Sequence, residues 1–273
     1  MPASTLQDLG QDLYPWVSRH QRDIDEHFDG RPLRELAQHE RDSLGQIDLF
    51  LLAFSNRSGS TLLSGILNQA GLPIPPRAEV FNSDSVIPVC IENSTPSFTD
   101  YFLAVTTGWA QGGRVGFKIG PRQMFWLARA GLLSHFRSLR IVNSRRRDRV
   151  AQAVSFHIAA RTGRWHSDME GTAPVGDVPY VAAEILERLQ TIHIDQYLVS
   201  YFADVHGVSL VEVFYEDLVD APDRELARVL DFIGITAADV AAVDLAALGI
   251  RRQGTDLNGD FAAQFRADFR HLA

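Results

Sequence analysis

The sequence predicts an α/β protein built on a parallel β-sheet, and three observations support that prediction. Short apolar segments typical of buried strands alternate along the chain with segments of helical periodicity. At least two of the apolar segments lead directly into a polar loop that opens a helix. The composition is that of a globular protein, with 45% hydrophobic and 22% charged residues in a chain of 273. Strands and helices in this order form parallel sheets with right-handed crossovers.

The N-terminal part of the chain is predicted to be helical. Apolar residues recur at mostly helical intervals over residues 6–28, with Pro15 as a kink or break, and a second helical stretch is expected over residues 32–44. We interpret residues 1–46 as an N-terminal helical extension whose role is packing or subunit contact. No linker or repeat divides the remainder, so residues 47–273 are expected to form one α/β domain.

Four segments read as strands. The segment 49–54 (Leu-Phe-Leu-Leu-Ala-Phe) is continuously apolar, as a strand buried on both faces should be. The other three are residues 115–119, 140–143 and 208–215. Helices are expected to follow these strands, opening at Thr61 and ending near Gly71, running through about Ala160, and spanning residues 222–233.

Composition excludes several classes of function. The single cysteine, Cys90, forms no internal disulfide, and the scattered histidines form no zinc motif. A net charge of -8 and a pI near 5.6 argue against broad binding of nucleic acids or anionic membranes. There is no secretory signal pattern, and the most apolar run is far shorter than a membrane span. We therefore expect a soluble cytoplasmic protein.

The loop at residues 55–61 (Ser-Asn-Arg-Ser-Gly-Ser-Thr) has the character of a phosphate site. Small residues let backbone N–H groups approach an anion, and the dipole of the following helix favours negative charge. Arg57 adds formal positive charge, and the hydroxyl groups of Ser58, Ser60 and Thr61 add donors. The alternative is a Ser/Gly turn that only caps the helix. The loop is not the nucleotide-hydrolase type, because Gly59 is followed by Ser60 rather than lysine.

A run of arginines at residues 145–149 marks a second candidate anion site. It follows the strand at 140–143, and Ser155 lies eight residues after Arg147, about two turns into the next helix. The alternative is that these charged residues are only the solvated start of a helix. Two anion sites at the carboxyl ends of parallel strands indicate a ligand with two separated phosphates. No Gly-x-Gly-x-x-Gly follows a strand, which disfavours a nicotinamide cofactor.

In order and spacing, these motifs resemble those of sulfotransferases, specifically the bacterial family typified by trehalose 2-sulfotransferase. Residues 57–63 are similar to the family's 5′-phosphosulfate loop, and residues 147–155 to its 3′-phosphate motif. Further similarities lie at residues 160–165, 215–218, 251–254 and 258–261. The resemblance implies a P-loop-like three-layer fold and 3′-phosphoadenosine-5′-phosphosulfate (PAPS) as sulfuryl donor. Transfer from this donor requires no metal, and the sequence shows no carboxylate cluster to hold one. The acceptor would be a hydroxyl of a carbohydrate or another small molecule.

The resemblance also implies which residues form the site. Arg57 would act in catalysis, and the residues expected to bind the donor are Arg57, Ser58, Gly59, Ser60, Thr61, Arg147, Ser155, Arg251, Arg252, Gln253 and Gly254. Where the bacterial family has Glu-Pro-x-Glu after the first helix, this chain retains only Glu79. Glu79 is therefore the candidate general base, with His157 in reserve, and Lys118 is placed to reach the donor or the acceptor.

Two other functions stay open at this stage. A P-loop nucleotide kinase would require magnesium and ATP, and the missing lysine counts against it. A non-catalytic relative that binds nucleotide would fit the proline residues that precede Glu79, Pro75 and Pro76. A homodimer is compatible with the N-terminal extension.

Overall fold

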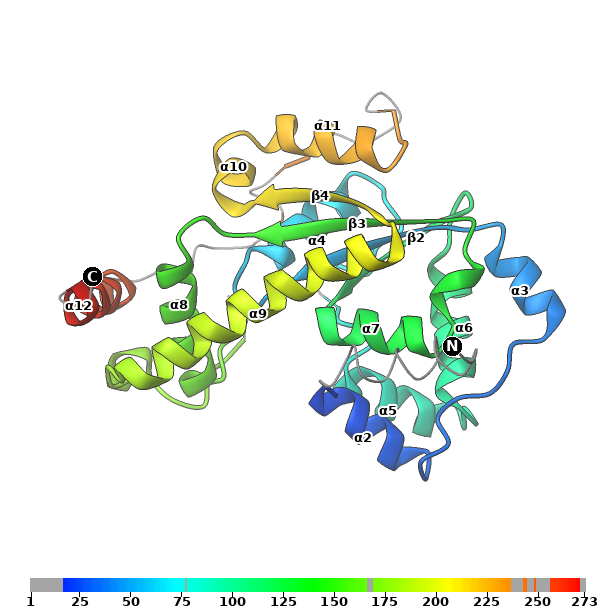
Figure 1. The fold of residues 1–273 in the computed structure, drawn as a ribbon, viewed down its shortest axis with the longest axis horizontal. Helices are drawn as coiled ribbons and strands as arrows, with labels where there is room; N and C mark the ends of the chain where they lie inside the picture. Colours follow the sequence, from blue (N-terminus) through cyan, green and yellow to red (C-terminus); the bar gives the residue numbers. More distant parts are fainter. Residues whose placement is uncertain are drawn as a thin grey trace, which may run out of the picture.

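The protein folds around a four-stranded sheet in which every pair of neighbouring strands is parallel (Figure 1). This computed structural model describes residues 17–76, 78–165, 169–236, 243–244, 248 and 256–270. The strands are β1 (Asp48–Phe54), β2 (Arg114–Ile119), β3 (Ser138–Arg145) and β4 (Ser209–Phe214), in the order β2-β1-β3-β4. The predicted α/β class is confirmed. All four predicted strands are present, with ends shifted by at most two residues.

Helices cover both faces of the sheet, which gives three layers (Figure 1). Alternate residues of β1 divide between two cores, because successive side chains of a strand point to opposite faces. Leu49, Leu51 and Ala53 join the larger core. Phe50 and Leu52 join the core on the opposite face.

The larger core is formed with α2 (Arg19–His27), α3 (Gln38–Leu44), α5 (Ser83–Glu92), α6 (Phe98–Trp109), α7 (Pro121–Arg129) and the C-terminal half of α9 (Ala182–His206). The opposite face carries α4 (Ser60–Gln69), α10 (Tyr215–Asp220) and α11 (Pro222–Phe232). Two short 3₁₀ turns span Leu133–His135 and Val175–Asp177.

A third core lies beyond the ends of β3 and β4. Here α8 (Arg149–Thr162) packs against the start of α9 and against α12 (Asp256–Arg270), the helix nearest the C-terminus (Figure 1). Phe261 and Phe265 of α12 are buried against α8 residues that include Ala153 and Phe156. This core therefore borders the edge of the sheet where all four strands end.

The second predicted N-terminal helix is partly wrong. Only residues 38–44 of the expected 32–44 are helical. The preceding backbone bonds to the start of α6 instead: the N–H of Phe98 donates to Pro32, and the N–H of Arg34 donates to Thr99 Oγ1 at 3.1 Å. Backbone groups satisfied by another element are not available for a helix of their own.

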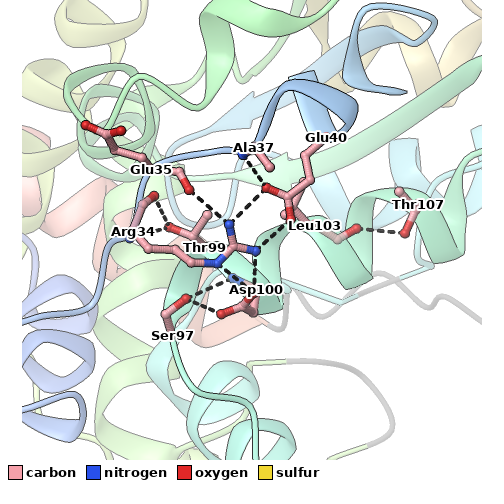
Figure 2. Close-up of polar contacts among 9 residues, drawn as sticks. All are labelled: Arg34, Glu35, Ala37, Glu40, Ser97, Thr99, Asp100, Leu103 and Thr107. Atoms are coloured by element: carbon pink, nitrogen blue, oxygen red, sulfur yellow. Dashed lines mark hydrogen bonds and ion pairs between the residues drawn. The ribbon is translucent and has the colours of Figure 1, made fainter. Parts of the chain in front are cut away.

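Arg34 fixes this extended stretch by a charged network (Figure 2). Its guanidinium donates to the carboxylates of Glu40 and Asp100. Glu40 also accepts from the N–H of Ala37, the residue that precedes α3, at 2.8 Å. Residues 17–46 thus pack on the larger core, where Ile24 and Leu44 are fully buried. Within the described ranges, no helix is long and apolar enough to cross a bilayer.

Candidate functional site

The polar loops predicted from the sequence meet at one edge of the sheet. All four strands are parallel, so their carboxyl ends share that edge, with β1 flanked by β2 on one side and β3 on the other. The loop of residues 55–59 follows β1 and leads into α4. In α/β sheets with this arrangement, ligands bind outside the carboxyl ends of the strands where the direction of strand succession changes. Here that point is the end of β1.

The backbone of this loop could hold an anion. Arg57 has a φ of 65° and Gly59 a φ of 94°, both in the left-handed region. Left-handed residues within such a turn direct successive N–H groups to one side. Gly59 is also the N-cap of α4 and offers no side-chain acceptor, so the N–H groups of the first turn have no capping side chain. The ring of Tyr215 closes the opposite side, since a Cβ on Gly59 would lie 2.7 Å from its Cδ2.

The three hydroxyl groups of the loop have different surroundings. Ser58 is fully buried, and its hydroxyl donates to Ser144 Oγ on β3 at 3.1 Å. Ser60 begins α4 and is also buried. Thr61 is half-buried and accepts from Lys118 Nζ at 3.1 Å. Ser58 therefore ties the loop to β3, while Thr61 joins it to β2.

The Arg57 side chain reaches across the site toward α8. Its Nε donates to Ser155 Oγ at 3.0 Å, and its Nη1 donates to the carbonyl of Trp165 at 2.6 Å. Burial lowers the pKa of Arg57 to about 10, assisted by the charge of Arg146, so the guanidinium is still protonated at neutral pH. The two residues that the resemblance assigned to different phosphates, Arg57 and Ser155, are direct neighbours.

Two buried glutamines with no recognisable motif in the sequence hold the start of the loop. Gln152 of α8 donates to Ser55 Oγ at 3.0 Å and to the carbonyl of Asn56 at 2.7 Å. Gln196 of α9 donates to the same Ser55 hydroxyl at 2.9 Å. Gln152 lies between the predicted Arg147 and Ser155, and this position is the only signal that the sequence offers for it.

The second candidate site is rich in ion pairs. Arg147 forms a bidentate pair with Asp217 at 2.8 and 2.7 Å, and its N–H faces the carboxylate of Glu216. Asp217 raises the pKa of Arg147, whose side chain is half-exposed. Arg146 lies over the ring of Tyr215, with 5.2 Å between its Cζ and the ring centroid. The acidic residues after β4 thus face the arginines after β3.

Glu79 lies beside the loop, fixed by two donors. Its Oε1 is 2.9 Å from Lys118 Nζ, and its Oε2 accepts from Asn82 Nδ2 at 2.8 Å. Lys118 is 2% exposed and also donates to Thr61, so it links the carboxylate to the first turn of α4. The structure therefore brings Glu79, Lys118 and Thr61 together.

His157, the reserve base, is fully buried in the third core. Its Nε2 lies 3.0 Å from the carbonyl of Pro179 and its Nδ1 lies 3.2 Å from Glu184 Oε2. Both ring nitrogens therefore have protein neighbours, and the ring links α8 to the segment before α9 and to the first turn of α9.

The predicted donor-binding residues Arg251, Arg252, Gln253 and Gly254 lie outside the described residues. The neighbouring α12 is described, and Arg266 from it pairs with Asp148, the N-cap of α8, at 2.6 Å. No cluster of three or more metal-binding side chains occurs in the part of the chain that the structure describes.

One buried acid near this edge also lacks a signal in the sequence. Asp195 of α9 is paired with Arg122 of α7 at 2.7 Å. Burial raises the pKa of Asp195 to about 6, against the opposing effect of Arg122. The sequence around Asp195 contains no motif, so it does not indicate that this helical acid is buried and paired.

Comparisons with known proteins find similarity to sulfotransferases, both among protein families and among solved structures. Residues 133–268, about half of the chain, match the family described as Stf0 sulphotransferase. A sulfotransferase from Alicyclobacillus acidocaldarius is 16% identical, with a TM-score of 0.46 over 83% of this chain and 94% of that one. The sulfotransferase domain of the Synechococcus PCC 7002 olefin synthase is 17% identical, with a TM-score of 0.47 over 80% and 86%. No curated protein matches the chain.

Proposed function

The chain belongs to the Stf0 sulphotransferase family, and from this premise we propose that it transfers a sulfuryl group from PAPS to a hydroxyl of a carbohydrate or other small molecule. The catalytic unit in this proposal is residues 47–273, with residues 1–46 as an extension that packs on it. The observation that carries the proposal is the first turn of α4, which has no capping side chain and lies beside two residues in the left-handed conformation, Gly59 and the half-buried Arg57.

The residues around this turn suit a doubly phosphorylated donor. The N–H groups of residues 59–61 and the dipole of α4 would hold the 5′-phosphate, with Arg57 as the charged partner. Arg147 and Ser155 would hold the 3′-phosphate, for which Arg147 exchanges its contact with Asp217. Hydrogen bonds from Gln152 and Gln196 keep the loop in place without using its N–H groups.

The chemistry that PAPS supplies is a sulfuryl group attached to a phosphate leaving group. Negative charge therefore grows on the leaving phosphate, next to the N–H groups of the loop and to Arg57. Donors fixed in advance at such a position typically contribute about 10²–10³ each in rate. This mechanism needs no metal ion.

Glu79 is the residue that we propose to accept the proton of the acceptor hydroxyl. It lies at the end of the loop after α4, and its contact with Lys118 connects it to Thr61 of the donor loop. A carboxylate held by a buried cation stays in one place, which favours proton transfer in a fixed geometry. General-base catalysis of this kind typically contributes about 10²–10⁴ in rate.

Ligand-dependent melting tests the donor. Adenosine 3′,5′-bisphosphate should raise the melting temperature more than AMP, because the second phosphate has its own site. At 100 times the dissociation constant, binding adds about 2.7 kcal/mol of stability. Equal shifts for the two ligands would contradict the 3′-phosphate site, and a larger shift with ATP and magnesium would favour a kinase.

Turnover with radiolabelled PAPS tests the reaction itself. A panel of sugars and other hydroxyl compounds should include at least one that gains the label. Bisphosphate binding without transfer to any acceptor would indicate a nucleotide-binding relative without catalytic activity.

A further inference from the structure

The side chain of Asn82 is diverted from the helix that it precedes. Asn82 is the N-cap of α5, yet its side chain makes no capping hydrogen bond. An asparagine at this position ordinarily accepts from an N–H of the first turn. Here its Oδ1 accepts from Gln123 Nε2 at 2.8 Å, and its Nδ2 donates to Glu79 Oε2 at 2.8 Å. The usual N-cap hydrogen bond is therefore absent, and the side chain contacts the candidate base instead.

Gln123 decides which way the Asn82 amide faces. It is 5% exposed and lies in the first turn of α7. Its Oε1 accepts from the N–H of Gly120 at 3.0 Å, and its Nε2 donates to the carbonyl of Phe81 at 2.9 Å as well as to Asn82. A backbone N–H only donates and a backbone carbonyl only accepts, so these two contacts fix the Gln123 amide in one orientation. The oxygen of Asn82 must then face Gln123 and its nitrogen must face Glu79.

Both oxygens of Glu79 are consequently controlled from the end of β2. Lys118 on this strand binds Oε1 directly. The N–H of Gly120, two residues later, donates to Gln123, Gln123 donates to Asn82, and Asn82 donates to Oε2. A carboxylate held at both oxygens from one strand end has a fixed plane as well as a fixed position.

We propose that Asn82 and Gln123 are positioning residues for sulfuryl transfer, which orient Glu79 toward the acceptor hydroxyl. This inference rests on the proposed role of Glu79 as general base. Proton transfer depends on the direction of the accepting lone pair, and a misplacement of 1 Å can cost about 10²-fold in rate.

The first test is Asn82→Asp. Aspartate is as good an N-cap as asparagine, so α5 should remain stable. It still accepts from Gln123 but places an oxygen where Glu79 now receives a donor. We expect kcat to fall by about 10²-fold, while the KM for the donor and the melting shift with adenosine 3′,5′-bisphosphate stay at wild-type values. Unchanged kcat would overturn the proposal.

Asn93→Asp is the matched control, because Asn93 is the C-cap of the same helix and its side chain donates to the carbonyl of Val89. Its kcat should stay within about twofold of wild type if activity is insensitive to a new carboxylate at the far end of α5. A loss equal to that of Asn82→Asp would overturn the positioning role, since helix stability alone would then explain both results.

The second test combines Asn82→Asp with Gln123→Met, which keeps the volume of the side chain and removes its hydrogen bonds. If Gln123 acts through Asn82, the double variant should be no slower than Asn82→Asp, because residues acting as one unit are not additive. Multiplied losses in kcat would overturn the relay. If Gln123→Met does not fold, the result with Asn82→Asp decides the question alone.

Failure of the proposed function is recognised separately. A wild-type protein that transfers no sulfuryl group, or a Glu79→Gln variant as fast as wild type, overturns the role of Glu79 and this inference with it. If Glu79→Gln lowers kcat but Asn82→Asp does not, only the positioning role is overturned.

Discussion

The side chain of Arg57 has a structural role and a proposed role in the reaction. Its guanidinium braces Ser155 and the carbonyl of Trp165, and the proposed reaction requires the same group beside the leaving phosphate. Arg147 differs, because it is half-exposed and its partner Asp217 lies in the segment after β4. The two arginines should therefore contribute at different stages of the reaction.

Arg57→Ala should lower kcat even at saturating donor, by about 10²–10³-fold, because charge develops on the phosphate that Arg57 faces. Arg147→Ala should instead raise the KM for the donor, because the 3′-phosphate does not change during the reaction. Steady-state kinetics with both substrates varied separates the two effects. If both variants changed only the donor KM, the assignment of Arg57 to the transition state would be wrong.

Glu79→Gln should lower kcat by about 10²–10⁴-fold with donor affinity near wild type, because glutamine keeps the size of the side chain but does not accept the proton. Turnover within threefold of wild type would count decisively against Glu79.

Among the elements, β1 and α4 depend on the conformation of the short loop between them. Gly59 combines a positive φ with the close approach of the Tyr215 ring. Gly71, just after α4, has a φ of 89° with no atom within 4 Å of a Cβ placed there. Substitutions at Gly59 and Gly71 can therefore separate the cost of backbone strain from the cost of steric contact.

Gly59→Ala should therefore destabilise the protein by about 1–3 kcal/mol more than Gly71→Ala, because both variants carry strain but only the first meets the Tyr215 ring. Urea unfolding of both variants measures the difference. Donor binding should weaken in Gly59→Ala alone. Equal losses of stability would mean that Tyr215 moves aside without cost.

The strands and the first loop could be predicted because their signals are local. A continuous apolar run followed by small residues identifies β1 and the turn at Gly59 without knowledge of the rest of the fold. Residues 32–37 were mispredicted because their hydrogen bonds go to the start of α6, more than 60 positions along the chain. Gln196 and Gln123 were missed for the same reason: their partners Ser55 and Asn82 lie 141 and 41 positions away.

At the scale of the whole molecule, the charged network around Arg34 fastens the N-terminal segment to the larger core (Figure 2). The hydrogen bonds from Arg34 lower the pKa of Glu40 from 4.5 to about 2, and they also lower the pKa of Asp100. A carboxyl whose pKa is lower in the folded state stabilises the fold above its unfolded pKa. That contribution is lost as the pH falls from about 4.5 toward 2.

Removal of this network by Arg34→Met should lower the free energy of unfolding at pH 7 and make it less sensitive to acid between pH 4.5 and pH 2. Urea titrations across that range measure both effects. Arg19→Met is the control, because Arg19 forms an exposed pair with Asp84 that should contribute little. Parallel pH curves for wild type and Arg34→Met would show that the network does not stabilise the fold.

The length of α9 has a thermodynamic consequence for the molecule. This 25-residue helix is part of two cores, with Ile185 and Ile192 in the third core and Leu198 and Phe202 in the larger one. Loss of either core would leave half of α9 without its packing, so neither core should melt independently. Calorimetry should accordingly show one transition, in which the measured enthalpy equals the van't Hoff enthalpy. A single cooperative unit also means that a ligand bound at the donor loop would protect α8 and α12 from hydrogen exchange by global unfolding as effectively as it protects the sheet.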